Sequence, residues 1–472
     1  MIKLVLPEIV VSLMAIVSFL FVFFKEETGK KLLYPTILIL GLVTLTSSIF
    51  SLNQEESLFF NTYQINLFSQ AFKLILAGSL LLVLSICDHT ESLSGEVKPE
   101  FFLFLSTATL GMMMLTSACE LIGLFISLEL ASISQYILVP LRRGKILNAE
   151  AGIKYLLFGA AASALTLYGL SFIFGTAKTL FLNEILQNIT SLIHLPLFGV
   201  GIFLTSAGFL FKLASFPFHF WAPDVYESAA TPVTTFIATT SKAAAVAVLI
   251  RLFQIFSVDH ASLTYILITL SFVSMTLGNL AAMIQKDMKR MLAYSSVAQA
   301  GYLLAGLLSQ TSSGFIAATF YTIAYLIMNF AAFMVMARIN SHNDNPTIKN
   351  FSGLADRSPL LALTLMISLL SLAGIPPLAG FTGKWFLFSA AMEKGHWILV
   401  LVGVVNSVIS LYYYLMVVKE AYLGKPESGQ GLLFLGIKTR LLSYASIASL
   451  IILGVFPTGL VHWLESIIKP LL

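Results

Sequence analysis

The sequence predicts an all-α polytopic membrane protein with about fourteen transmembrane helices, including two inverted five-helix repeats that each contain a broken helix. Three observations predict this class. Of the 472 residues, 58% are hydrophobic and 11% are charged, whereas soluble domains carry about 25% charged residues. Apolar runs of roughly 20 residues, the length that crosses a bilayer, recur along the whole chain. Two of these runs are interrupted by proline close to a lysine.

The predicted spans are joined by short connections. None of these connections holds a soluble domain, because a self-sufficient core needs about 40 residues or more. The first apolar run is too long for the core of a signal peptide, so we expect it to be a retained span. The expected spans are residues 2–24, 32–52, 65–87, 100–118, 120–140, 150–175, 196–219, 231–252, 263–284, 290–308, 314–337, 359–391, 396–418 and 441–463.

Proline and glycine mark the seventh and twelfth spans as broken helices. Pro217 follows Lys212 in the seventh span, and Pro376 and Pro377 precede Lys384 in the twelfth. Proline removes a helical hydrogen bond, so both helices should be interrupted near these residues. Proline and glycine are also common in membrane helices generally, but the neighbouring lysines favour a functional break.

The two broken helices occupy matching places in two five-span units. Because each unit has an odd number of spans, the second is inverted relative to the first, as in many transporters. We expect three N-terminal helices in 1–99, repeat 1 in 100–255, repeat 2 in 256–420 and a C-terminal transmembrane helix in 421–472.

Charge and cysteine content exclude several classes of function. The net charge of +4 is too small to suggest nucleic acid as a partner. Cys87 and Cys119 are the only cysteines and each lies in or beside an apolar run, so disulfides, zinc sites and iron–sulfur ligation are not expected. No nucleotide-binding glycine motif is present. We therefore expect no cofactor and no metal bound by this chain.

The distribution of lysine and arginine predicts the orientation. Of the 27 such residues, 17 lie in odd-numbered connections and 3 in even-numbered ones. Positive charge stays on the cytoplasmic side. The clusters that begin at Lys25, Arg142, Lys286 and Lys425 should therefore face the cytoplasm, with both termini on the other side.

Five lysines lie inside predicted spans: Lys73, Lys154, Lys212, Lys242 and Lys384. An ionised side chain at mid-bilayer costs roughly 2.5–3.5 kcal/mol on insertion scales, and such residues mark transport pathways. Lysine suits proton transfer because it can lose its proton when buried, whereas arginine stays charged.

Glu129 is the acidic residue deepest in a predicted span, and it is the natural counter-ion for Lys212. An adjacent carboxylate favours the protonated lysine, so moving or protonating Glu129 would let the lysine release its proton. Other roles are open at the remaining positions. Lys73 also fits a snorkelling anchor, Lys154 fits a cytoplasmic anchor, and His219 fits a hydrogen bond to the broken backbone.

Three motifs resemble the proton-translocating antiporter-like subunits of complex I. They are FKLASFPFHFWAPDVYESAATPVTTFIATTSKAA, QKDMKRMLAYSSVAQAGYLLAG and GIPPLAGFTGKW, in that order. With EAGIKYLLFGAAASAL before them, the resemblance covers about residues 100–420. A lysine at 384, and no long lateral helix after the last span, make the chain most similar to the branch that contains subunit N of NADH-quinone oxidoreductase.

The resemblance implies a role for each buried charge. Glu129 and Lys212 would form the ion pair, Lys242 the central relay and Lys384 the terminal proton donor, while Lys154 matches a family lysine of less certain role. The resemblance also implies that the chain pumps protons across the cell (inner) membrane. Its partners in the lipid bilayer would be neighbouring antiporter-like subunits and small membrane subunits. FMN, iron–sulfur clusters and quinone would belong to partner subunits.

Two departures from the family pattern affect the details. Ser228, Ala229 and Ala230 replace a Gly–small–Pro turn, and Gln299 stands where many relatives have histidine. Gln299 can therefore be only a non-titrating contact.

Two other functions stay open. One is a cation/proton antiporter component of the Mrp type without a redox arm, and the other is a structural subunit that anchors its neighbours. The electron donor (NADH, ferredoxin or F420) is chosen elsewhere, and we take NADH by default.

Overall fold

The computed structural model confirms a helical multi-pass fold. It describes residues 2–23, 27–87, 97–141, 146–255, 261–339, 346–426 and 431–471. In those ranges twelve helices are long and apolar enough to cross a membrane, and Pro359–Ala373 is a shorter apolar helix. The count of fourteen spans and the inverted relation between the repeats stay predictions.

The chain divides into two compact units. The first consists mainly of Met1–Leu213 and Ser228–Leu263, and the second mainly of Ala214–Glu227 and Thr264–Pro470. The division places the broken segment after Leu213 in the second unit, although the helices before and after it belong to the first.

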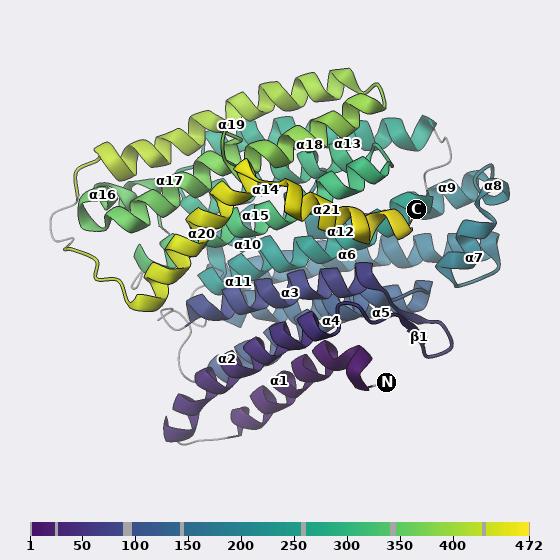
Figure 1. Cartoon of the computed structure of the whole chain (residues 1–472), viewed down its shortest axis with the longest axis horizontal. Helices are drawn as coiled ribbons and strands as arrows, with labels where there is room; N and C mark the ends of the chain where they lie inside the picture. Colours follow the sequence, from purple (N-terminus) through teal and green to yellow (C-terminus); the bar gives the residue numbers. More distant parts are fainter. Residues whose placement is uncertain are drawn as a thin grey trace. The chain divides into compact units, whose positions relative to one another are not determined.

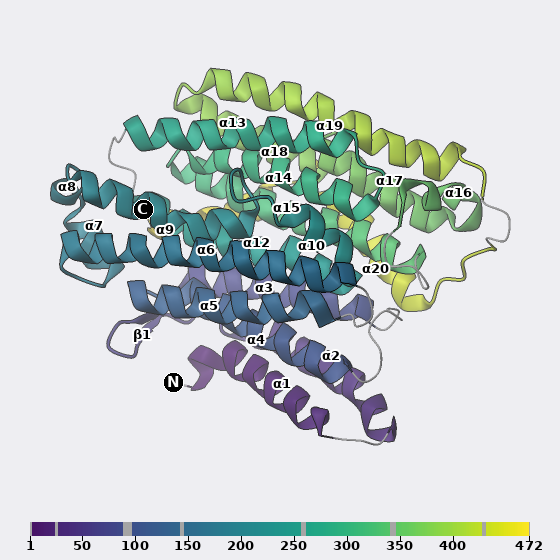
Figure 2. The same cartoon turned by 180° about the vertical axis from the view of Figure 1, so that it is seen from behind.

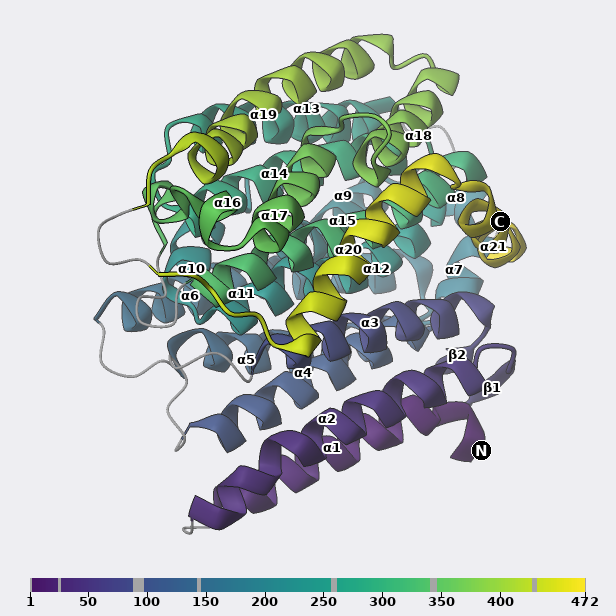
Figure 3. The same cartoon turned by 60° about the vertical axis from the view of Figure 1, so that its left-hand side comes forward.

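In the first unit, α1 packs against α2 and α4, and α6 packs against α5 and α9 (Figures 1–3). Its elements are η1 Ile2–Val5, α1 Leu6–Val22, α2 Glu27–Phe50, β1 Glu56–Leu58, β2 Tyr63–Ile65, α3 Leu67–Ile86, α4 Lys98–Ser117, α5 Leu121–Leu138, η3 Val139–Leu141, α6 Ile146–Ala177, α7 Leu182–Gln187, α8 Ile189–Leu192, α9 Pro196–Leu213, α11 Thr231–Phe236, the π-helical turn η4 Ile237–Ser241 and α12 Lys242–Ile255.

In the second unit, α15 is central and contacts α14, α17, α18, α20 and α21. The elements are α10 Ala222–Ser228, α13 Ala261–Met283, α14 Met288–Leu307, α15 Ser312–Ile339, η5 Ile348–Phe351, α16 Leu354–Arg357, α17 Pro359–Ala373, α18 Ala379–Glu393, α19 Trp397–Leu423, α20 Ile437–Val455, α21 Thr458–Ile468 and η6 Lys469–Leu471.

Both predicted helix breaks are present. In the predicted seventh span, α9 ends at Leu213 and the chain becomes helical again only at Ala222. In the twelfth, α17 ends at Ala373 and α18 begins at Ala379. Gly374 closes α17 in the left-handed conformation at φ 90°, which glycine adopts without steric cost.

Three local features differ from the sequence-based expectation. An antiparallel hairpin, with Glu56 paired to Ile65, precedes α3. The predicted last span 441–463 is instead two helices, because Pro457 lacks the N–H that would continue α20. A π-helical turn lies between α11 and α12, directly before Lys242, in the predicted eighth span.

The turn that departs from the family pattern still begins the next helix. Ser228 ends α10, and Ala230 is the N-cap of α11 with Pro232 in the first turn. Proline fits that position, where its missing N–H has no helical partner to lose.

An ion-pair cluster joins α10 to α14 in the second unit. Arg290 contacts Asp224 at 2.8 Å and Glu227 at 2.7 Å. Asp287 caps α14 by accepting the Arg290 backbone N–H at 2.8 Å. Burial, and then the Glu227 charge, raise the pKa of Asp287 to about 6, against the opposing hydrogen bond from Arg290 and the Lys289 charge.

The raised Asp287 pKa makes stability pH-dependent. The neutral acid stabilises the fold fully below about pH 4, and this contribution is lost as the pH rises through 6. Asp287→Asn stays neutral and keeps the cap. We compare the free energy of unfolding of the variant with that of the wild type by thermal unfolding in detergent. This difference should grow in favour of the variant by about 1–2 kcal/mol as the pH rises from 5 to 7.5. A pH-independent difference between the two proteins would contradict this assignment.

The close packing of α6 on α9 predicts that Gly169 of α6 cannot be replaced by a larger residue without loss of stability. A Cβ at Gly169 would lie 2.4 Å from Thr205 N and 2.5 Å from Gly201 O, whereas one at Gly175 of the same helix meets nothing within 4 Å. We expect Gly169→Val to cost about 3 kcal/mol or more and Gly175→Val less than about 0.5. Thermal unfolding of both variants checks this, and equal midpoints would disprove it.

Candidate functional site

The predicted residues divide between the two units. Glu129, Lys154, Lys212 and Lys242 belong to the first unit. His219 and Lys384 belong to the second, and each group is therefore described by itself.

Lys212 lies buried in the last turn of α9, one residue before the helix ends. The free carbonyls at a helix C-terminus favour a positive charge there. The carboxylate of Glu129 on α5 interacts electrostatically with Lys212. Among the described residues, however, no ion pair within 4.0 Å joins them, and Lys212 Nζ has no hydrogen-bond partner. Direct pairing of Glu129 with Lys212 therefore stays a prediction.

Glu129 instead receives a hydrogen bond from Ser163 of α6. The Tyr136 hydroxyl lies beside the same serine, and a Cβ at Gly159 would collide with it. The partly buried carboxylate of α5 is therefore bound by a neutral hydroxyl group of α6.

A polar chain continues from α5 toward Lys242. The Tyr155 hydroxyl donates to Gln135 Oε1 at 2.9 Å, and the Gln135 side chain lies 3.3 Å from Ser241 Oγ. Ser241 directly precedes Lys242. Sequence reasoning missed Gln135 and Tyr155 because one isolated polar residue in a span does not reveal its partner on another helix.

Lys242 begins α12 and is buried. The π-helical turn before it places Thr239 and Thr240 against α3, where Thr240 Oγ1 lies 2.7 Å from Ser79 Oγ. π-helical turns inside helices often occur at functional sites. This one directs two threonine hydroxyls to Ser79 of α3 and Ser241 to Gln135 of α5, directly before the lysine in the chain.

Lys154 has a different environment. It pairs with Glu150 one turn earlier in α6 at 2.7 Å, and its side chain is 39% exposed. Exposed pairs of this kind contribute little to stability. The role of Lys154 stays a prediction.

Lys384 is held across the second helix break. Its Nζ donates to the carbonyl of Ala373, the last residue of α17, at 3.1 Å and to Ser407 Oγ of α19 at 3.3 Å. It also lies 4.3 Å from the centre of the Tyr302 ring. The break therefore supplies the carbonyl that replaces water around a buried ammonium group. Sequence reasoning missed Tyr302 and Ser407.

Gln299 binds the neighbouring carbonyl of the same break. Its Nε2 donates to Leu372 O at 3.1 Å, and its Oε1 accepts from the Tyr321 hydroxyl. The glutamine is therefore a fixed, non-titrating contact at the end of α17.

His219 lies in the break between α9 and α10 and is buried. Its ring packs against Phe216 and Phe220. Its Nδ1 has no hydrogen-bond partner in the described part of the chain. A proton-carrying role for His219 stays a prediction.

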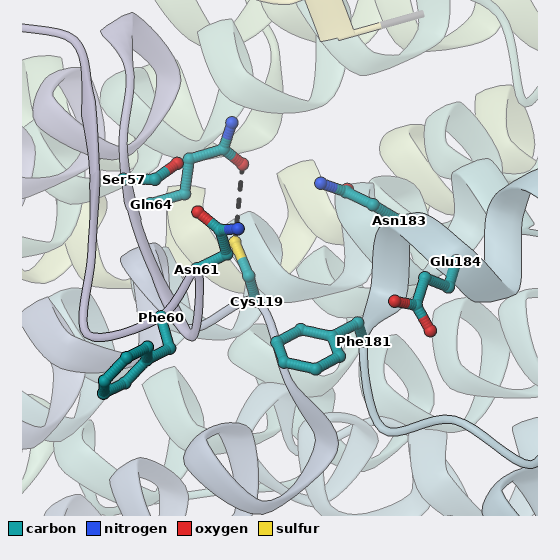
Figure 4. A pocket seen from close by; sticks show the side chains of 8 residues that line it. All are labelled: Ser57, Phe60, Asn61, Gln64, Cys119, Phe181, Asn183 and Glu184. Carbon is teal, nitrogen blue, oxygen red and sulfur yellow. Dashed lines mark hydrogen bonds between the residues drawn. The ribbon is translucent and has the colours of Figure 1, made fainter.

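A polar pocket of about 500 Å³ lies beside the β-hairpin in the first unit (Figure 4). The Cys119 thiol donates to Gln64 Oε1 at 3.4 Å there, and the Arg251 guanidinium lies 3.1 Å from Cys119 Sγ. In the described ranges no three His, Cys, Asp or Glu side chains gather in a way that could hold a metal ion.

Comparison with known proteins identifies the family. Residues 118–410 match the model of the transmembrane family "NADH:quinone oxidoreductase/Mrp antiporter, TM". The chain belongs to this family. It is 43% identical over 466 residues to "NADH-quinone oxidoreductase subunit N 2" of Syntrophobacter fumaroxidans, which covers 99% of this chain and 98% of the relative. The predicted resemblance to the subunit N branch is therefore confirmed.

Two solved structures share the fold. A chain of respiratory complex I from Thermus thermophilus with bound aureothin has a TM-score of 0.83 and 32% identity, covering 97% of this chain and 98% of that one. A chain of the Mrp complex from a Dietzia species has a TM-score of 0.83 at 20% identity, covering 100% and 96%. The second likeness concerns the fold alone.

The packing of Gly374 on Lys384 provides a test of the environment of Lys384. A Cβ at Gly374 would lie 3.1 Å from Lys384 Cδ, and φ there is 90°. Gly395 has a similar φ of 77° with nothing within 4 Å, so it controls for backbone strain. We expect Gly374→Ala to cost about 1–3 kcal/mol more than Gly395→Ala, by thermal unfolding. Equal costs would mean that Lys384 is not confined there.

Proposed function

We propose that the chain is a proton-translocating membrane subunit of NADH:quinone oxidoreductase, of the subunit N type. In this proposal it uses the free energy of electron transfer from NADH to quinone, which takes place in other subunits. The observation that carries the transport role is Lys384, a buried lysine bound by a carbonyl, a hydroxyl and an aromatic ring at a helix break.

These neutral partners suit a lysine that changes its protonation state. Ala373 O and Ser407 Oγ accept hydrogen bonds from an ammonium group and also from a neutral amine. Release of the proton therefore leaves no unpaired carboxylate in the apolar interior, where an uncompensated charge is costly. Lys384 can thus alternate between two states without losing its position.

The other buried charges complete the proposed pathway. Glu129 controls the charge of Lys212, Lys242 relays the proton, and Lys384 is the terminal donor. Gln135 and Ser241 connect α5, which carries Glu129, to the turn directly before Lys242. Lys154 and His219 are secondary candidates for proton transfer.

The proposed setting follows from charge distribution and family membership. The chain would lie in the cell (inner) membrane with both termini on the non-cytoplasmic side, among neighbouring antiporter-like and small membrane subunits. Of the basic residues used for this orientation, Lys25 and Arg142–Lys145 lie outside the described residues. FMN, iron–sulfur clusters and quinone would be held by partner subunits.

The second candidate is a cation/proton antiporter component of the Mrp type. The fold likeness to an Mrp complex keeps it open, but the relatives that match over almost the whole chain carry the other name. Flavin and iron–sulfur subunits in the purified complex would favour the redox-driven role, and their absence would favour the antiporter.

Substitution of Lys384 tests the transport role. Lys384→Ala should abolish most proton translocation and leave assembly largely intact, because it removes a buried charge. Lys384→Arg should also fail, since arginine does not release its proton. The measurement is proton uptake by reconstituted vesicles at matched complex content, with Lys394→Ala at the exposed end of α18 as control. Wild-type translocation by the arginine variant would show that Lys384 supplies only a fixed positive charge and transfers no proton.

A further inference from the structure

A second buried carboxylate–lysine pair lies in the first unit, outside the residues assigned above. Glu8 in the first turn of α1 and Lys73 of α3 are 2.6 Å apart, Oε1 to Nζ, and their side chains are 9% and 0% exposed. A snorkelling lysine extends its ammonium group to water. Lys73 instead reaches a carboxylate of another helix, and its role as an anchor stays a prediction.

Tyr63 of β2 completes this group. Its hydroxyl donates to the same Oε1 of Glu8, and Lys73 Nζ lies 5.1 Å from the centre of its ring. Burial, and then the Glu8 charge, raise the pKa of Tyr63 well above its ordinary value, so the phenol remains a neutral donor. Glu8 Oε2 has no hydrogen-bond partner in the part of the chain that the structure describes.

Stability alone does not explain why this pair is buried. Replacing a buried ion pair with apolar residues is often neutral or stabilising, because desolvation offsets the attraction. Ionisable groups within membrane helices mark ion and proton pathways. A pair with one unused carboxylate oxygen has the capacity to bind a further proton.

Glu8 also borders a pocket of about 420 Å³ between α1, α4 and α5, covered by the hairpin. Figure 3 shows the β1–β2 hairpin beside the start of the chain, and residues of α1 and of the hairpin line this pocket. Successive strand residues face opposite sides, so Tyr63 lines this pocket while Gln64 lines the one in Figure 4. The other polar residues that line the pocket beside Glu8 are Ser12, Thr62, Glu120 and Ser127.

Helix α3 connects the pair to the proposed relay. Lys73 and Ser79 are six residues apart on this helix, which corresponds to a rise of about 9 Å. Ser79 contacts Thr239 at 3.2 Å and Thr240 at 2.7 Å, in the turn that positions Lys242. One helix therefore carries both Lys73 and the serine that contacts the turn before Lys242.

We propose that Glu8 and Lys73 form a second proton-exchange site, which takes up a proton from water in the pocket and returns it there. A hydronium ion transfers its proton to Glu8, which gives a neutral carboxylic acid beside the Lys73 ammonium group and one water molecule. The positive charge then left on Lys73 repels positive charge at Lys242 and favours proton departure from it. This inference rests on the proposed function, because it couples the pair to the relay lysine.

The test replaces both charges together in the intact complex. Glu8→Gln and Lys73→Met alone should lower the yield of assembled complex, since each leaves one buried charge unpaired. The double variant should restore assembly and quinone reduction, but with a loss of proton translocation in reconstituted vesicles. Glu465→Gln of α21 with Lys469→Met of η6, a more exposed pair, is the matched control and should change nothing. Wild-type translocation by an assembled Glu8/Lys73 double variant would overturn the inference.

A second variant keeps the inference testable if the double variant does not assemble. Tyr63→Phe preserves both charges and the ring but removes a donor that stabilises the ionised carboxylate. The pH at which translocation is half-maximal, varied on the pocket side, should therefore rise. Glu8 faces Lys73 and Tyr63 and shares the pocket with Glu120, and Cys119 interacts with Tyr63. An unshifted profile would show that Glu8 does not exchange protons.

Lys242→Ala separates the two possible failures. Wild-type translocation by Lys242→Ala would overturn the proposed function itself. Loss of translocation in Lys242→Ala, together with wild-type behaviour of the Glu8/Lys73 double variant and of Tyr63→Phe, would overturn only the second exchange site.

Discussion

The absence of hydrogen-bonding solvent in the membrane interior is the constraint on which this structure depends. A helix that breaks there exposes carbonyl groups, and each must find a donor inside the protein. At the end of α17 the donors are two side chains: Lys384 binds Ala373 O, and Gln299 binds Leu372 O. The break and the buried lysine are thus one feature, because each satisfies a requirement of the other.

The same constraint organises the polar groups of the first unit. Many serine and threonine hydroxyls there bond to carbonyls of their own helix, but a few reach across to another helix. Ser163 reaches Glu129, and Ser79 reaches the turn before Lys242. These contacts give Glu129 a neutral partner and fix the turn before Lys242, while Lys73 and Lys154 pair with carboxylates.

Much of the fold was predictable because apolar run length and proline position act locally. The runs predicted the helices, and Pro217 and Pro376–Pro377 predicted both breaks within a few residues. The hairpin at Glu56–Ile65 was not predicted, because two three-residue strands produce no periodic signal. The π-helical turn before Lys242 was missed for a related reason: its sequence, IATTS, suits an ordinary helix equally well.

The candidate site was predictable in part. The sequence by itself placed five lysines in long apolar runs. Four of them are buried, whereas Lys154 is 39% exposed, and the buried Glu8 was not anticipated. The sequence also determined the membrane class and where two helices break. Only the tertiary structure decided the partners: Ala373 and Ser407 for Lys384, Glu8 for Lys73, and Ser163 for Glu129. These contacts join residues 11 to 65 positions apart, and they depend on which helix faces are packed together. A hydrophobic pattern that is apolar on every side of a helix carries no information about that choice.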